Sequence, residues 1–208
     1  MSLTLYGLGR SRSFRVLWAL EEVGAEYEYL DLDMGSTADD GNLSSTYLKL
    51  NPQGKVPTLI DDEFVLTESN AIVNYVASFD GGEGFIPQAN SRERAEYDEL
   101  CFFIQSDFEQ PLWTSGKHRF ALPEEHRVPE ILPTAVWEFE KSQTALKELV
   151  DLNHFAIGGH FTFADILLAH TIGWADSFKF PVDQQLLAYR DRHFERPAVA
   201  AALARLPH

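Results

Sequence analysis

Two serine-containing segments carry the residue types that bind an anion or a thiol at the start of a helix. Ser11-Arg12-Ser13 follows the short apolar segment 3–6, and Glu68-Ser69 precedes a stretch with helical periodicity. Backbone N–H groups and the helix dipole favour a carboxylate or phosphate at such a position, and they lower the pKa of a thiol held there. Because a serine at the same place also caps a helix, the residues alone leave the ligand-site and capping interpretations open.

A third segment, Lys55-Val56-Pro57, introduces a predicted strand. Proline has no N–H to donate to a neighbouring strand, so this strand begins at an edge or after an unusual peptide bond. A cis bond between Val56 and Pro57 fits a tight turn before an edge strand, although trans is the commoner form. The choice between the two depends on the fold around the segment.

Arginines are concentrated next to the first serine segment. Three of the five basic residues among the first 80 are Arg10, Arg12 and Arg15, which can form a local positive site for an anion; solvated arginines at a helix end are the alternative. The whole chain of 208 residues is acidic, with 32 Asp and Glu against 17 Lys and Arg and a formal net charge of -15. That charge argues against a nucleic-acid or membrane-surface partner.

Hydrophobic periodicity predicts the elements that position these segments. In the first 80 residues it predicts a β-α-β unit, a β-hairpin and a final helix, at 3–6, 14–23, 27–32, 56–60, 64–66 and 69–79. The β-α-β unit predicts two parallel strands joined by a right-handed crossover. Gly24 stands where the first helix should end.

Helical patterns outweigh strand patterns in the rest of the chain. We therefore predict residues 1–80 as an α/β domain, 81–90 as a Gly-rich linker and 91–208 as an all-helical domain. The predicted helices lie at 91–115, 129–150, 163–178, 183–194 and 197–206. Residues 162–165 have the form of an N-capping box, which we interpret as structural.

Several kinds of site and location are disfavoured by what the sequence lacks. Cys101 is the only cysteine, so there is no internal disulfide and no cysteine-based zinc site. The histidines show no spacing typical of metal ligands, and no metal is expected. The N-terminal segment has no apolar core of signal-peptide length, and no run of about 18 apolar residues occurs. We expect a soluble, cytoplasmic protein.

Four stretches, in their order and spacing, resemble the signature segments of cytosolic glutathione transferases. They are SRSFRVL, NPQGKVPTL, LTESNAI and FADI, at 11–17, 51–59, 66–72 and 163–166. The resemblance covers nearly the whole chain and implies an α/β thioredoxin-like N-terminal domain followed by an all-α domain. It also makes the cis form of the Val56–Pro57 bond the expected one.

The resemblance implies how glutathione, as co-substrate, binds to the N-terminal domain. Lys55 is expected to hold the glycine end, and the main chain of Val56 to pair with the cysteinyl backbone. The Glu68 carboxylate is expected to attract the γ-glutamyl ammonium. The Ser69 hydroxyl and N–H are expected to hold the γ-glutamyl carboxylate.

The sulfur of glutathione is expected to lie beside Ser11. Serine-type members commonly place the activating serine five residues before the arginine matched by Arg15, which is Arg10 here, so Ser11 departs from that spacing by one. Zeta-type members carry two serines and then a cysteine, and Ser11 matches the second serine. Arg12 matches the cysteine and adds positive potential near the sulfur. Tyr6 is the rival donor to the sulfur.

For the helical domain the resemblance implies a pocket for a second, electrophilic substrate. Gln110 lies in a segment similar to one near glutathione in zeta-type members, and a polar residue before a helix kink at Pro111 is the alternative. Trp113, with Phe108 and Trp174, is a candidate for lining that pocket. Ordinary packing in the core is the alternative for all three aromatic residues.

The activity implied by the resemblance is conjugation of glutathione to a small electrophile, as in detoxification, by a homodimer. One alternative is a zeta-like isomerase, in which glutathione adds to a cis double bond and then leaves, as with maleylacetoacetate. The other is a non-enzymatic binding protein that has kept the glutathione transferase fold.

Overall fold

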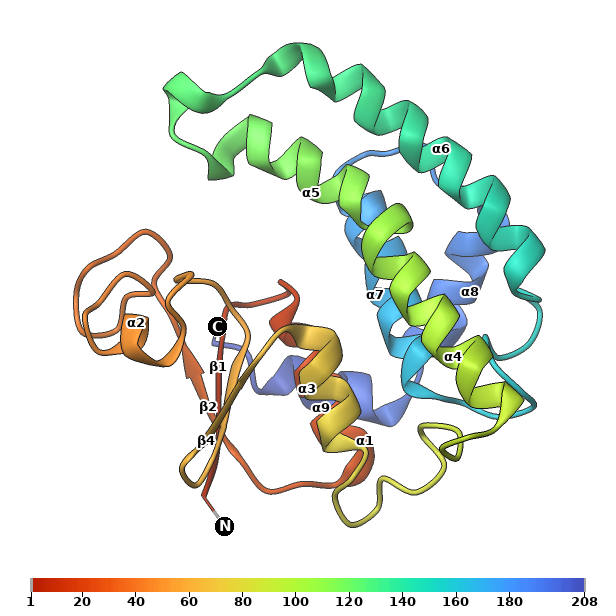
Figure 1. The fold of residues 1–208 in the computed structure, drawn as a ribbon, viewed down its shortest axis with the longest axis horizontal. Coiled ribbons are helices and arrows are strands. Elements are labelled where there is room, and N and C mark those ends of the chain that lie inside the picture. The colour runs from red at the N-terminus through yellow and green to blue at the C-terminus, as the bar shows by residue number, and fades with distance from the viewer. Residues whose placement is uncertain (1, 208) are drawn as a thin grey trace. The chain divides into compact units, whose positions relative to one another are not determined.

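The structure is a computed structural model that describes residues 2–207, which form two compact units (Figure 1). The first unit contains the chain up to Ile86 together with the C-terminal segment from Glu195, and the second contains Pro87–Phe194. The predicted domains, 1–80 and 91–208, place the C-terminal segment in the helical domain instead. That assignment concerns functional domains and stays a prediction.

A mixed sheet forms the centre of the first unit. Within residues 2–207 the sheet has four strands, β1 Leu3–Gly7, β2 Glu28–Asp31, β3 Thr58–Asp61 and β4 Phe64–Thr67, in the spatial order β2-β1-β3-β4. β1 and β2 are parallel, which confirms the prediction from the β-α-β pattern, and β3 is antiparallel to both β1 and β4. The first strand alternates buried and half-buried residues, so its register is fixed by the face that packs on helices.

Helices cover both faces of this sheet. α1 (Ser13–Val23) ends at Gly24, whose φ of 67° is the left-handed conformation that ends a helix most easily in glycine. α3 (Ser69–Val76) buries the apolar side of its short amphipathic pattern. In Figure 1, α1 and α3 lie on one side of the sheet, and the single-turn helix α2 (Tyr47–Leu50) lies on the other.

The last helix, α9 (Pro197–Ala204), is tied to the end of α1 by two ion pairs. Arg196 donates to both carboxylate oxygens of Glu22, at 2.5 and 2.7 Å, and Arg205 donates to Glu21 at 2.9 Å. The Glu22 side chain is only 7% exposed, so its charge depends on the arginine for compensation. α9 therefore belongs to the packing of the first unit.

All regular secondary structure in Pro87–Phe194 is helical, as predicted. Its α-helices are α4 Arg92–Phe103, α5 Gln110–Gly116, α6 Leu132–Leu149, α7 Phe163–Ser177 and α8 Gln184–Phe194. α7 is buried along most of its length, and it packs against α4 and α8. It is therefore the central helix of this unit.

The prediction of one continuous helix over 91–115 is wrong. α4 and α5 are separated by a π-helical turn, Ile104–Phe108, and a second π-helical turn, Lys117–Ala121, follows α5. Pro111 lies in the first turn of α5, where its missing N–H removes no helical hydrogen bond. π-helical turns are rare and occur mostly as single-turn bulges inside α-helices, so a prediction of helix over the whole stretch does not separate them.

The capping box predicted at the start of α7 is confirmed. The carboxylate of Asp165 is fully buried and accepts hydrogen bonds from the N–H of Thr162 at 2.7 Å, the N–H of Ala156 at 2.8 Å and the hydroxyl of Tyr189 at 2.5 Å. One buried charge thus connects α7, α8 and the loop before α7.

Among residues 2–207, no helix combines the length and apolar character that crossing a membrane requires.

Candidate functional site

Ser11 lies in the turn between β1 and α1, and Ser13 is the first residue of α1. Their hydroxyl groups contact each other. Their Oγ atoms are 3.0 Å apart. Ser11 Oγ also accepts the N–H of Ser13 at 3.3 Å, and Ser13 Oγ accepts the N–H of Leu8 at 3.2 Å. The N-cap residue of α1 is Arg12, whose side chain makes no capping hydrogen bond. The capping interpretation of Ser11 is therefore wrong by one residue, although Ser11 does accept a backbone N–H of the helix.

Gly7, the last residue of β1, leaves the space that this arrangement needs. A Cβ atom at Gly7 would lie 2.7 Å from Cε2 of Tyr29 and 2.8 Å from Cβ of Ser13. Both distances are well inside van der Waals contact, so a larger residue would push the start of α1 away from the strand. The sequence identified Gly7 only as the end of a strand.

The three arginines near this turn have different environments. Arg10 is exposed and Arg12 is half-buried, whereas Arg15 is only 1% exposed. Nη1 of Arg15 donates to Ser69 Oγ at 3.3 Å. The alternative interpretation, solvated arginines at a helix end, therefore does not hold for Arg15. Arg15 acts inside the unit, where its charge connects the first turn of α1 with the start of α3.

Glu68 and Ser69 begin α3 with an unusual backbone. Glu68 has φ 70° and ψ 112°, a conformation that costs a non-glycine residue about 1–3 kcal/mol and is concentrated at functional sites. Glu68 is the N-cap residue, but its side chain makes no capping hydrogen bond. Ser69 is the first residue within the helix and is 5% exposed. The capping interpretation therefore does not explain either side chain.

The segment before β3 is held in place by hydrogen bonds to its main chain. The hydroxyl of Tyr47 and the side-chain amide of Asn51 donate to the carbonyl oxygen of Lys55, at 2.5 and 2.8 Å. Burial raises the pKa of Tyr47, so its hydroxyl stays protonated. Both residues position the chain that leads to Val56. Sequence reasoning missed them as site residues, because their partners are backbone groups that only the fold brings close.

The Val56–Pro57 peptide bond is cis, as the resemblance implies. Just before it, Gly54 adopts a positive φ of 60°. The side chain of Lys55 is exposed, and its Nζ donates to Oε1 of Gln53 at 2.8 Å. The Lys55 charge therefore stands at the surface of this turn, accessible to an anion.

The strand register places these segments at one end of the sheet. Tyr6 in β1 is opposite Thr58 in β3, and Thr58 is opposite Thr67 in β4. β1 ends here and leads into the serine segment 11–13. β4 also ends here and leads into Glu68-Ser69. β3 starts here, directly after the segment 55–57. The sheet therefore positions all the predicted glutathione-binding residues at this end, which we call the convergent end.

Tyr6, the rival donor to the sulfur, faces the α2 side of the sheet. Its ring centroid lies 5.5 Å from that of Tyr47 in α2. Leu5, the next residue in the strand, is fully buried, and successive side chains of a strand point to opposite faces. Tyr6 therefore packs on the face opposite to α1 and α3.

The candidates for the second substrate lie in the second unit. The exposed Gln110 donates from Nε2 to Thr114 Oγ1 at 3.2 Å, and Trp113 is half-buried. Phe108 is fully buried and stacks on Phe139 with 5.0 Å between ring centroids. Phe108 is therefore a core residue and not a pocket residue.

Trp174 belongs to a partly exposed group of aromatic rings. Its ring meets Phe178 edge-on, with 5.6 Å between centroids, and Phe178 meets Phe120 in the same way at 6.0 Å. Phe120 is 59% exposed. A Cβ atom built on Gly116 would lie 3.4 Å from both phenylalanines, so these rings pack directly on the end of α5.

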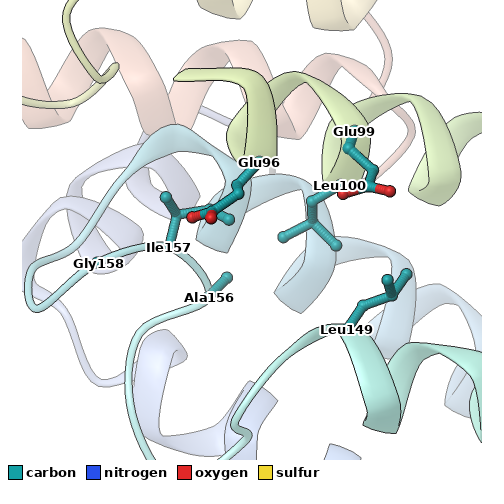
Figure 2. Close-up of a pocket in the computed structure, with 7 residues that line it drawn as sticks. All are labelled: Glu96, Glu99, Leu100, Leu149, Ala156, Ile157 and Gly158. Atoms are coloured by element: carbon teal, nitrogen blue, oxygen red, sulfur yellow. The ribbon is translucent and has the colours of Figure 1, made fainter. Parts of the chain in front are cut away.

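Figure 2 shows a small pocket in the second unit, between α4 and the chain that follows α6. Its volume is about 110 Å³, and its lining is Glu96, Glu99, Leu100, Leu149, Ala156, Ile157 and Gly158. None of the predicted site residues lines it. Two carboxylates and this small volume do not suit an anionic tripeptide such as glutathione.

The comparisons with known proteins agree with the resemblance. Residues 1–78 match the family model for the glutathione S-transferase N-terminal domain. The sequence is 30% identical to the zeta-class glutathione S-transferase of Euphorbia esula, over 87% of this chain and 79% of that protein. It is 29% identical to the glutathione S-transferase GstA of Escherichia coli O157:H7, over 89% of each.

A solved structure shows the same similarity. The theta-class glutathione S-transferase of Xanthomonas axonopodis pv. citri, with glutathione bound, is 30% identical, covers 97% of each chain and superposes with a TM-score of 0.75. The chain belongs to the glutathione transferase family, a family of enzymes. The expected fold, a thioredoxin-like unit and a helical unit, is thereby confirmed.

In this transferase the convergent end combines several features that favour a negatively charged ligand. Two helix N-termini start there, the buried Arg15 contributes a charge beneath one of them, and Lys55 stands at the third segment. Each favours a negatively charged group. Within the described residues, no group of three or more His, Cys, Asp or Glu side chains is arranged to hold a metal ion. The helix N-termini, Arg15 and Lys55 can bind a ligand and polarise it by hydrogen bonds and positive charge.

Proposed function

We propose that this transferase binds reduced glutathione at the convergent end and conjugates its sulfur to a small electrophile. The observation that carries the proposal is the strand register, which gathers the serine segment 11–13, Lys55-Val56 and Glu68-Ser69 at that end. A relative with glutathione bound, 30% identical over nearly the full chain, supports the ligand.

The γ-glutamyl end of glutathione fits the start of α3. Its carboxylate accepts hydrogen bonds from the Ser69 hydroxyl and N–H, while the Glu68 carboxylate pairs with its ammonium. Arg15 donates to Ser69 Oγ, so the Ser69 hydrogen is left to donate to the ligand. The positive φ of Glu68 is the local strain that this arrangement requires.

The other end of glutathione fits the segment before β3. The exposed Lys55 pairs with the glycine carboxylate, exchanging its hydrogen bond with Gln53 for an ion pair. The main chain of Val56 pairs with the cysteinyl backbone of the ligand. The hydrogen bonds from Tyr47 and Asn51 to the Lys55 carbonyl keep this main chain in one conformation, which lowers the entropy lost on binding.

The cysteinyl sulfur then lies at the start of α1. The Ser11 hydroxyl donates to it, and the half-buried Arg12 and the helix dipole add positive potential, so the thiol proton leaves to solvent more easily. The thiolate attacks the electrophilic carbon. The carbon–sulfur bond forms as the leaving group departs with its electron pair, or as an activated double bond accepts the pair.

Conjugation of glutathione to a chloronitrobenzene tests this role. Ser11→Ala should reduce turnover about 10- to 100-fold, because a hydrogen bond to the reacting sulfur is lost. Ser78→Ala is the matched control, since Ser78 is an exposed serine in the turn just after α3 and should keep wild-type turnover. Full activity of Ser11→Ala would remove Ser11 from the role.

Isomerisation of a cis double bond is the second candidate, favoured by the 30% identity to a zeta-class relative over 87% of this chain. In that reaction the thiolate adds to the double bond, the intermediate rotates, and the thiolate leaves unchanged. A maleylacetoacetate assay separates the two: isomerisation without conjugation of chloronitrobenzene would replace the leading proposal. A protein that binds glutathione but turns over neither substrate would be a non-enzymatic binding member.

We also propose a cytoplasmic homodimer that acts in detoxification, with Gln110 and Trp113 close to the electrophile. Exposed apolar residues in both units are consistent with association of two copies, since Phe64 is 49% and Phe102 71% exposed. Light scattering on a size-exclusion column should give twice the chain mass of 23.5 kDa. A mass of one chain would contradict the homodimer.

A further inference from the structure

Asn42 is a buried amide that the proposed reaction does not use. It is 4% exposed and lies in the loop between β2 and α2, outside the segments predicted to form the site. Its two amide atoms have backbone partners in different parts of the chain. Oδ1 accepts the N–H of Gly35 at 2.6 Å, and Nδ2 donates to the carbonyl oxygen of Gly54 at 2.5 Å. Asn42 therefore connects this loop to the residue just before Lys55.

The orientation of the Asn42 amide is fixed by its partners. A backbone N–H can only donate and a carbonyl oxygen can only accept, so turning the amide over would make both contacts repulsive. The N–H of Asn42 also donates to the carbonyl oxygen of Asp33 at 3.1 Å, which closes the loop. The loop is compact, since a Cβ atom added to Gly41 would lie 2.1 Å from the carbonyl oxygen of Ser36. Asn42 thus binds Gly54 from an anchored position.

Lys55 lies between two peptide planes that are both held by side chains. The carbonyl oxygen of Gly54 belongs to the plane before Lys55, and Asn42 binds it. The carbonyl oxygen of Lys55 belongs to the plane after it, and Tyr47 and Asn51 bind that oxygen. Because a peptide unit is planar, fixing its oxygen limits the rotation of the whole unit. The two planes together determine φ and ψ of Lys55, and with them the direction in which its side chain leaves the main chain.

We propose that Asn42 is a positioning residue for Lys55, and that it directs the Lys55 side chain toward the glycine carboxylate of bound glutathione. This inference rests on the proposed function, since it assumes that Lys55 pairs with that carboxylate. Asn42 also meets Gly54 through its main chain, because a Cβ atom added to Gly54 would lie 3.2 Å from the carbonyl oxygen of Asn42. A lysine held in this way loses less freedom on binding, so its ion pair contributes more to the affinity.

Calorimetric titration with two ligands tests the inference. One ligand is glutathione, and the other is its glycyl ethyl ester, which lacks the charged carboxylate that Lys55 would bind. Asn42→Ala should weaken the binding of glutathione about 3- to 5-fold and the binding of the ester less than about 1.5-fold, because only the first uses the Lys55 ion pair. Asn153→Ala is the matched control, since Asn153 is an exposed asparagine of the second unit, and it should leave both affinities unchanged.

The same substitution in a Lys55→Ala background shows whether its effect passes through Lys55. Lys55→Ala should itself weaken the binding of glutathione about tenfold, as the loss of a charged hydrogen bond does. Asn42→Ala should then add less than about 1.5-fold. If Asn42→Ala does not fold, Asn42→Ser takes its place, because a single, shorter hydroxyl cannot span the partners at Gly35 and Gly54. The same titrations apply to it.

Three outcomes overturn the inference and leave the proposed function standing, provided that Lys55→Ala weakens the binding of glutathione. Equal losses for the two ligands would mean that Asn42 has a merely structural role. No loss for either ligand would mean that it has no role. A full effect in the Lys55→Ala background would mean that it acts on another part of the site. If Lys55→Ala binds glutathione as the wild type does, the role of Lys55 fails and the inference fails with it.

Discussion

Cys101 and Ser11 differ in burial, and this difference decides which of them can take part in the chemistry of a thiol ligand. Cys101 lies in α4 with 7% exposure, and burial raises the pKa of its thiol to about 12. Ser11, in contrast, is partly exposed at the start of α1. The only protein thiol is thus kept protonated, and the reactive sulfur of the proposed mechanism comes from the ligand.

Cys101 should therefore resist alkylation in the folded protein. Because the thiolate is the nucleophile, a thiol with a pKa of about 12 stays protonated at about pH 8 and reacts slowly. Incubation with iodoacetamide, followed by mass spectrometry, should leave the native chain unmodified while free glutathione in the same tube is consumed. The chain unfolded in guanidinium should gain one label. Labelling of the native chain as fast as glutathione would contradict this.

Single residues were predictable where their type alone carries the signal. A hydroxyl at a helix start identified Ser11, and the same reasoning identified Ser69. Ser13 and Gly7 could not be found in this way, because their roles depend on the distance between a strand end and a helix. The charge of Arg15 is visible in the sequence, but its burial and its contact with Ser69 are not, because packing sets the direction of its side chain.

Hydrogen bonds and ion pairs between elements hold each unit together. In the second unit the Asp165 carboxylate connects three segments. In the first unit Arg196 and Arg205 fasten α9 to α1. The two arrangements differ in burial, since the Asp165 side chain is fully buried and the Arg196 side chain is 30% exposed. Their contributions to stability should differ in the same sense.

Asp165→Ala should destabilise the protein severely. It leaves two buried N–H groups and the Tyr189 hydroxyl without their acceptor, and each hydrogen bond to a charged group contributes about 1.5–3 kcal/mol. We expect a loss of about 3 kcal/mol or more in the free energy of unfolding, measured by denaturant titration. Asp191→Asn, a 63% exposed carboxylate, is the control and should change stability by less than about 1 kcal/mol. Equal effects would contradict the proposed anchoring role.

Arg196→Ala should destabilise the first unit more than Arg205→Ala does. Arg196 compensates Glu22, whose side chain is 7% exposed, while Arg205 pairs with Glu21 and is itself 47% exposed. We expect losses of about 1–3 kcal/mol for Arg196→Ala and less than about 1 kcal/mol for Arg205→Ala. Thermal denaturation of the two variants beside the wild type gives the comparison. A lower melting temperature for Arg205→Ala would reverse the account of how α9 is held.

Elements were predictable where periodicity is strong. The β-α-β unit, the hairpin and α7 follow from regular apolar spacing and from glycine or capping residues at their ends. The interruption of helix 91–115 by a π-helical turn leaves no such signal. The packing of α9 on α1 could not be read from a local pattern either, because it depends on contacts between the two ends of the chain.

The net charge of -15 acts on the whole molecule. Glutathione is an anion, so a uniformly acidic surface would repel it. The accessible positive charges at the convergent end are Arg10, Arg12 and Lys55, all partly or fully exposed. The site is thus a local exception on an acidic protein. At this scale the composition only argues against some classes of partner, whereas the position of the local positive site depends on the fold.

Charge reversal tests this local effect. Arg12→Glu should weaken glutathione binding about fivefold or more at low ionic strength, and the effect should shrink as salt is added. Lys141→Glu makes the same change in net charge on α6 of the second unit and should leave the affinity within about twofold. Equal losses for the two variants would mean that only the total charge matters.

Calorimetric titration of glutathione into the wild-type protein and into Ser69→Ala tests the central claim most directly. The account predicts saturable binding of one glutathione per chain. Ser69→Ala should raise the dissociation constant about tenfold or more, because a hydrogen bond to the γ-glutamyl carboxylate is lost, and Ser78→Ala should bind as the wild type does. Binding that is absent in the wild type, or unchanged in Ser69→Ala, would contradict the assignment of the convergent end as the glutathione site.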